Sequence, residues 1–158
     1  MHDSLTRPLR ADDLPSLMRV ADEAELFPGA MLPDMAAPSL DGRTPDLWLV
    51  AERAGEPIGF AFCEPERMTA GTWNMLAIAV LPDRQGAGVG SALVAAAEGR
   101  LAAAGGRVLL VETAGTPGFA RTRGFYRARG YAEEARIRDF YQDGEDKVVF
   151  WKRLVPVA

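Results

Sequence analysis

The sequence predicts a single α/β domain, of the α+β kind, in which about four helices flank a mixed, mostly antiparallel sheet of six to seven strands. Three observations lead to this expectation. Apolar segments typical of strands alternate with segments of helical period. Turn signals join neighbouring strands into hairpins. The 158 residues, 48% hydrophobic and 25% charged, match one ordinary folded domain. We therefore expect one domain, 1–158, with its core at about 5–154.

The N-terminal part predicts a strand, a helix and an irregular segment. Residues 5–10 form the expected strand. A helix over 12–26 follows, with Asp12 as its N-cap. Several prolines and glycines then interrupt 27–45, where only a short helix at 32–37 fits the pattern.

Three strands are expected in the middle of the chain, at 48–53, 58–64 and 72–80. The first two are joined by AlaGlyGluPro, which is a hairpin signal. A second glycine-containing turn precedes the third strand. An antiparallel arrangement of all three follows from these short connections.

The C-terminal part predicts a helix, a strand, a second helix and a strand pair. Alanine and leucine dominate 91–104, which favours a strong helix. The Val/Leu-rich strand at 107–113 is expected to be buried on both faces, as strands with parallel neighbours are. A helix over 120–129 precedes the final strands, 131–137 and 147–154, which a polar turn separates.

Composition and single-residue counts exclude several kinds of chemistry. The net charge of −4 gives no attraction for nucleic acid. Cys63 is the single cysteine, so we exclude disulfides and thiolate zinc clusters and expect a small core residue rather than a nucleophile. His2 is the single histidine, which removes Ser/His/Asp triads and histidine metal sites. With no long apolar segment, we expect a cytoplasmic protein without metal or membrane contact.

The segment Arg84–Ser91 reads ArgGlnGlyAlaGlyValGlySer and lies between a predicted strand and a predicted helix. A helix N-terminus offers unpaired N–H groups and a partial positive charge to an anion. Gly86, Gly88 and Gly90 remove side chains that would keep a diphosphate away from this backbone. We therefore interpret the segment as a phosphate-binding loop, against the alternative of a flexible loop before an alanine-rich helix.

Two other glycine motifs do not fit this segment. A dinucleotide-binding GxGxxG motif would need glycine or alanine at position 91, which is Ser91. A Walker loop would need GlyLys followed by Ser or Thr, and that pair does not occur. A nicotinamide-binding fold is therefore disfavoured.

Two motifs in order resemble those of the GNAT superfamily of acyl-CoA-dependent N-acetyltransferases. The first is ValLeuProAspArgGlnGlyAlaGlyValGlySer at 80–91, in which Gln85, Gly88 and Gly90 fill the positions that define the signature. The second is PheTyrArgAlaArgGlyTyr at 125–131. The resemblance extends over about 5–154.

This resemblance implies a GNAT fold whose fourth and fifth strands splay apart, and a set of contacts to acetyl-CoA. Backbone groups in the fourth strand would bind the pantetheine arm, and the glycine loop would bind the diphosphate. The implied residues are Ile78, Ala79, Val80, Arg84, Gln85, Gly86, Ala87, Gly88, Val89, Gly90, Ser91 and Tyr126. The implied reaction is direct attack of a primary amine on acetyl-CoA in a ternary complex. A small-molecule amine or a peptide N-terminus is the expected acceptor.

The same resemblance implies roles for three further side chains. Tyr126 matches the tyrosine that protonates the leaving thiolate in many members, although an aromatic packed in the core explains it too. Glu112 resembles the glutamate base of the ribosomal-protein alanine N-acetyltransferase subgroup, with surface ion pairing as the alternative. Tyr141 resembles an acceptor-contacting tyrosine of that subgroup, or is simply a surface aromatic residue.

One departure from the family pattern concerns the loop after the fifth strand. Many members have an asparagine there that contacts the cofactor, whereas this loop has none, and Thr116 is a candidate substitute. A non-catalytic acyl-CoA-binding module stays open as an alternative to an enzyme. A homodimer stays open too.

Overall fold

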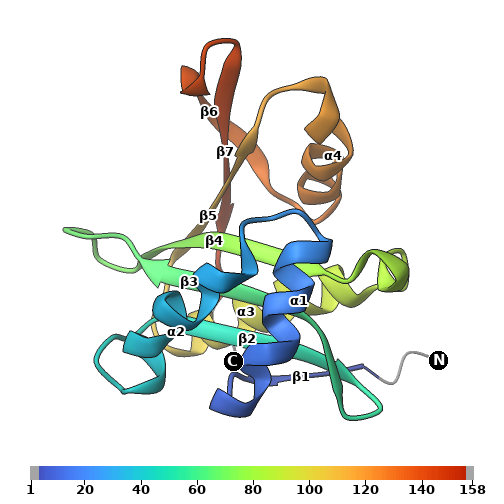
Figure 1. Cartoon of the computed structure of the whole chain (residues 1–158). Coiled ribbons are helices and arrows are strands. Elements are labelled where there is room, and N and C mark those ends of the chain that lie inside the picture. The colour runs from blue at the N-terminus through green and yellow to red at the C-terminus, as the bar shows by residue number, and fades with distance from the viewer. Residues whose placement is uncertain (1–3, 156–158) are drawn as a thin grey trace.

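The computed structural model describes residues 4–155, which form a seven-stranded sheet with helices on both faces (Figure 1). Within these residues no helix is both long and apolar enough to cross a membrane. The elements are β1 (Ser4–Pro8), η1 (Ala11–Asp13), α1 (Leu14–Glu23), η2 (Gly29–Met31), α2 (Leu32–Leu40), β2 (Leu47–Arg53), β3 (Glu56–Pro65), β4 (Thr72–Val80), η3 (Pro82–Arg84), α3 (Val89–Ala103), β5 (Val108–Ala114), η4 (Pro117–Phe119), α4 (Ala120–Ala128), β6 (Ala132–Gln142) and β7 (Glu145–Arg153).

The strand order is β1-β2-β3-β4-β5-β7-β6, and every neighbouring pair is antiparallel except β4 and β5. These two parallel strands pair only from Thr72 with Val108 to Met75 with Val111. β4 then continues to Val80 beside β3, while β5 continues beside β7. The two strands therefore splay apart, and the predicted fold class is confirmed.

The sheet separates the helices into two sets. A Cβ atom at Gly59 of β3 would lie 3.4 Å from Leu93 of α3, so this side of β3 faces α3. The next residue, Phe60, points to the other side, where its ring meets that of Phe27 after α1, with 6.2 Å between centroids. α1 therefore covers the face opposite to α3 (Figure 1).

A bulge in β4 determines which side chains reach the α1 face. The β3–β4 register shifts by one residue between Phe62 and Cys63, which leaves Leu76 as an extra residue in β4. β3 itself alternates without interruption, so Glu64 points to the same face as Phe62. Asn74 pairs with Glu64 and shares that face, since cross-strand partners lie on one side of a sheet.

The core consists of apolar side chains from both faces of the sheet and from the helices. Cys63 belongs to it: the side chain is fully buried, and burial raises the pKa of its thiol to about 12. A thiol with such a pKa is protonated at neutral pH and unreactive, so Cys63 is the expected core residue.

Several predicted boundaries were wrong in their details. Asp12 is not the cap of the first helix, because 11–13 form a 3-10 turn and Asp13 is the N-cap of α1. The short helix after the first breakers extends to Leu40 rather than ending at 37. The strands of the last hairpin were predicted too short. β6 and β7 continue toward each other until only Asp143 and Gly144 form the turn between them.

Asp13 supports the N-terminal layer through a buried ion pair. Its carboxylate accepts hydrogen bonds from Nη1 and Nη2 of Arg7, at 2.8 and 2.7 Å, and from the backbone N–H of Arg10 at 2.8 Å. The Arg7 bonds are the main reason that the pKa of Asp13 is lowered, against the opposing effect of burial.

We predict that Asp13→Asn lowers the free energy of unfolding by about 2 kcal/mol, because the buried guanidinium loses charge-assisted bonds. The melting temperature should fall by about 4 to 8 °C. A lowered native pKa gives stability above the unfolded pKa and loses it as pH falls through the native value, so the difference between the proteins should shrink in acid. Asp12→Asn, at an exposed neighbour, is the control and should melt like the unmodified protein.

Candidate functional site

The glycine loop connects the end of β4 to the first turn of α3. Gly86 and Gly88 have φ angles of 81° and 83°, in the left-handed region that favours glycine. Gly88 is the N-cap of α3, and its carbonyl accepts the first helical hydrogen bond, from Ala92 at 3.0 Å. The N–H groups of residues 89–91, which lie between Gly88 and Ala92, have no intrahelical acceptor and are available to an anion.

Gln85 fixes the start of this loop. Its Nε2 donates to the carbonyl of Val80 at 3.1 Å, which ties the loop to the last residue of β4. One donor of this amide is therefore used within the protein, so Gln85 positions the loop in addition to its predicted contact with the diphosphate.

Sequence reasoning missed a cation beside this loop, the guanidinium of Arg129. It lies 3.8 Å from the ring centroid of Phe125, donates to the Phe125 carbonyl at 2.9 Å, and contacts the hydroxyl of Ser91. The Phe125 ring lies 3.5 Å from where a Cβ atom of Gly90 would be, so α4 packs on the first turn of α3. The spacing of four between Phe125 and Arg129 was the available signal, because it places both on one helix face.

Among residues 4–155, no strand pairs with the splayed edge of β4 beyond Met75. The N–H of Leu81 bonds to the carbonyl of Ile58 at 2.9 Å, so Leu81 directs its polar groups toward β3. By alternation Ala79 does the same, while Ile78 and Val80 direct theirs into the splay. Of the three predicted residues, Ile78 and Val80 thus have backbone groups that an extended ligand can reach.

Tyr126 lies in the α4–sheet interface, on the face covered by α3. Its ring is buried against those of Phe125, Tyr131 and Phe150, with centroids 5.3, 5.9 and 5.6 Å away. Burial is the main cause that raises its pKa. A phenol in this setting stays protonated at neutral pH, and the packing role is present whether or not the hydroxyl acts on a substrate.

Glu112 lies just beyond the last β4–β5 pair, on the face opposite to Tyr126. Its Oε1 accepts from Nδ2 of Asn74 at 3.0 Å and lies 3.1 Å from Nζ of Lys147. The same Asn74 nitrogen donates to Oε1 of Glu66 at 3.0 Å. The structure thus brings Glu112 into a network with three residues that sequence reasoning did not select.

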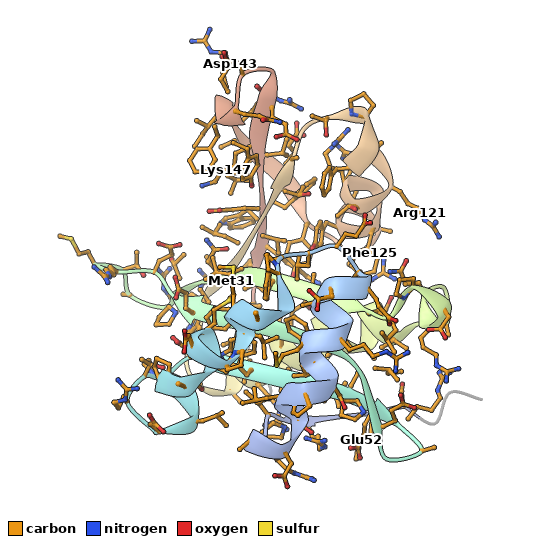
Figure 2. The ribbon with its side chains drawn as sticks, in the orientation of Figure 1. Met31, Glu52, Arg121, Phe125, Asp143 and Lys147 are labelled. Carbon is orange, nitrogen blue, oxygen red and sulfur yellow. The ribbon has the colours of Figure 1, made fainter. Side chains whose placement is uncertain are left out.

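Tyr141 lies near this network, on the projecting hairpin of β6 and β7. Its side chain is 46% exposed and packs edge-to-face on Phe140, with 5.1 Å between centroids. Partial burial, followed by the charges of Glu112 and Glu145, raises its pKa. Figure 2 shows the neighbouring Lys147 on the same hairpin, above Met31, which precedes α2.

The loop after β5, which lacks the asparagine found in many family members, is held by an arginine. Nη1 of Arg123 donates to the carbonyls of Ala114 and Thr116, each at 2.8 Å. An arginine of α4 therefore fixes the shape of this loop, and Thr116 takes part through its backbone. Across the described residues, 4–155, no group of three or more His, Cys, Asp or Glu side chains could hold a metal ion.

Comparison with known proteins gives a consistent family. The acetyltransferase (GNAT) domain profile matches residues 44–133. No curated protein matches the sequence significantly. A GNAT-family protein from Desulfovibrio desulfuricans is 28% identical, with a TM-score of 0.88, over 96% of this chain and 99% of that one.

Two more distant structures share the fold. A ribosomal-protein alanine N-acetyltransferase from Escherichia coli is 20% identical with a TM-score of 0.78, over 98% of this chain and 96% of that one. A phosphinothricin acetyltransferase from Sinorhizobium meliloti, in complex with acetyl-CoA, is 19% identical with a TM-score of 0.77, over 97% of this chain and 89% of that one. Since the family profile covers more than half of the sequence, the chain belongs to the GNAT acetyltransferase family.

Proposed function

We propose that the protein transfers an acetyl group from acetyl-CoA to a primary amine by direct attack, and that 1–158 form one N-acetyltransferase domain. The observation that carries the proposal is the splay of β4 and β5. The α3 N-terminus lies at one end of the open β4 edge, and Tyr126 and Glu112 approach the splay from opposite faces of the sheet.

The protein would hold acetyl-CoA mainly through backbone groups. Ile78 and Val80 bond the pantetheine arm as a neighbouring strand would. The N–H groups at the start of α3 bind the diphosphate, and the helix dipole and the guanidiniums of Arg84 and Arg129 favour its charge. The phosphinothricin acetyltransferase solved with acetyl-CoA supports this choice of co-substrate.

The chemical step would use one residue on each face. Glu112, directly or through a water molecule, takes a proton from the ammonium of the acceptor. The neutral amine nitrogen then forms a bond to the thioester carbonyl carbon, the carbon–sulfur bond breaks, and the nitrogen loses a second proton to solvent. Tyr126 donates its proton to the departing thiolate and regains one from solvent. The products are an acetylated amine and CoA, with no covalent enzyme intermediate.

A turnover assay tests the proposal. Purified protein, acetyl-CoA and a panel of amines and short peptides are incubated, and released CoA is measured with a thiol-reactive dye. Release of CoA that depends on an added amine supports an enzyme. Absence of an initial burst supports direct attack without a covalent intermediate. If CoA raises the melting temperature but no amine is acetylated, the alternative of a non-catalytic acyl-CoA-binding module holds instead.

We predict that Glu112→Gln lowers kcat/KM about tenfold at neutral pH, because solvent replaces a general base only in part. The loss should shrink at alkaline pH, where more of the amine is already neutral. Glutamine can still accept from Asn74, so the melting temperature should change little. Glu133→Gln, on the exposed strand β6, is the control. Equal pH–rate profiles for the Glu112 and Glu133 variants would assign Glu112 to structural pairing alone.

A further inference from the structure

A second acidic site lies next to the proposed reaction centre. It is a hollow of about 530 Å³ between the segment before β2 and the end of β3, and the residues that line it include Asp46, Glu64, Glu66 and Arg67. Three potential negative charges thus meet one positive charge.

The pKa of Glu64 shows how the charges around this hollow are balanced. Its pKa is raised, first by burial and then by the charges of Asp46 and Glu66, with Arg67 opposing the increase. A carboxylate with a raised pKa is one that the protein does not fully compensate. A cation supplied from outside would lower the electrostatic cost of ionising all three acids.

Asn74 connects the hollow to Glu112. Its Nδ2 donates to Oε1 of Glu66 and Oε1 of Glu112, each at 3.0 Å, so these two oxygens lie within twice that distance of each other. The hollow and the predicted base are therefore adjacent, and Glu64 is the cross-strand partner of Asn74.

The other atom of this amide lacks a partner. Asn74 is 3% exposed, and its Oδ1 is buried without a hydrogen-bond donor among the described residues. The orientation of the amide follows from its two acidic neighbours, because ionised carboxylates accept only from the NH₂ group. A buried acceptor without a donor is costly, so the two acids determine the orientation of Asn74 at the expense of its Oδ1.

We propose that the acceptor is a dication, whose reacting amine lies at Glu112 while a second cationic group is bound in the hollow by Asp46, Glu64 and Glu66. The inference rests on the proposed acetyl transfer and names the class of its substrate. Two sources supply such a dication: a small α,ω-diamine, or a peptide whose N-terminus is followed by lysine or arginine.

The test compares acceptors that differ only in the second charge. Linear alkyl monoamines are matched with α,ω-diamines of equal length, and Ala-Lys peptides with Ala-norleucine peptides. We expect kcat/KM to favour the dication of at least one pair by about tenfold or more, as for a hydrogen-bonded charge. The pair that shows the preference identifies the source. Equal values within both pairs, from an enzyme that acetylates amines, would overturn the inference.

Variants locate the second cation. The double variant Asp46→Asn with Glu64→Gln should reduce the dication-to-monocation ratio of kcat/KM to about one. Glu133→Gln, which removes a carboxylate outside the hollow, should keep the ratio of the unmodified protein. An unchanged ratio in the double variant would place the discrimination elsewhere and refute the assignment.

Binding is measured separately, so that failure of catalysis can be distinguished. The preferred dication is titrated by calorimetry into the CoA-bound unmodified protein and into the CoA-bound double variant. If no turnover occurs, each dication is titrated in turn. Binding that the double variant loses supports the acidic hollow even without acetyl transfer. Absence of binding to the unmodified protein contradicts the hollow, whereas absence of turnover alone contradicts only the enzyme.

Discussion

Gly88→Glu is expected to abolish CoA binding. A glutamate at the N-cap of α3 places a negative charge where the diphosphate would lie and repels it. The substitution also forces a side chain onto a φ angle of 83°, at a cost of about 1–2 kcal/mol. The space around the added Cβ is open, so the fold itself should persist. Calorimetry should detect no CoA binding, and the stabilisation of the melting temperature by CoA should vanish.

Two further variants separate the causes. Gly88→Ala introduces the backbone strain without the charge and should weaken CoA binding less than glutamate does. Gly99→Glu adds the same side chain to the middle of α3, where the surrounding space is also open, and should leave CoA affinity unchanged. Unaltered CoA affinity in Gly88→Glu would remove the diphosphate from this loop.

Tyr126→Phe is expected to lower kcat by about 10² while leaving the affinity for acetyl-CoA nearly unchanged. The hydroxyl is removed, but the ring keeps its contacts with Phe125, Tyr131 and Phe150. Because burial raises the pKa of Tyr126, the unmodified enzyme should keep this acid protonated, without an alkaline loss of kcat below pH of about 10. The loss in the variant should shrink with an acyl donor whose leaving thiol has a low pKa.

Tyr131→Phe supplies the matched control. The Tyr131 hydroxyl donates to Oε2 of Glu98 at 2.7 Å, so it is already engaged within the protein. Its removal should cost stability without a comparable loss of kcat. Full kcat in Tyr126→Phe, under conditions where chemistry is rate-limiting, would mean that the tyrosine only packs and that solvent protonates the thiolate.

The parts of the fold that were predictable have local causes. β4 was placed at 72–80 because apolar residues and flanking turns mark both ends. The loop at 84–91 was recognised because the glycines and the following helix are adjacent in sequence. Such signals need no knowledge of tertiary contacts, which is why order and type of the elements agreed with the structure.

The surroundings of Glu112 were not predictable in the same way. Asn74 and Lys147 approach it from β4 and β7, and both contacts depend on strand register. The last hairpin was underestimated for a related reason. Period-two patterning reveals a strand when one face is buried, and every residue of β6 is exposed.

The bulge at Leu76 gives one strand two separate tasks. The single additional residue shifts the alternation of side chains by one position. Every residue before it in β4 therefore points to the opposite face from the one it would have without the bulge. After the shift, β4 offers main-chain groups along its open edge. Before it, the strand offers the Asn74 side chain to the carboxylates of Glu66 and Glu112. If the same residues continued β4 in regular alternation without the bulge, Asn74 would turn toward α3, and those two acids would lose the amide between them.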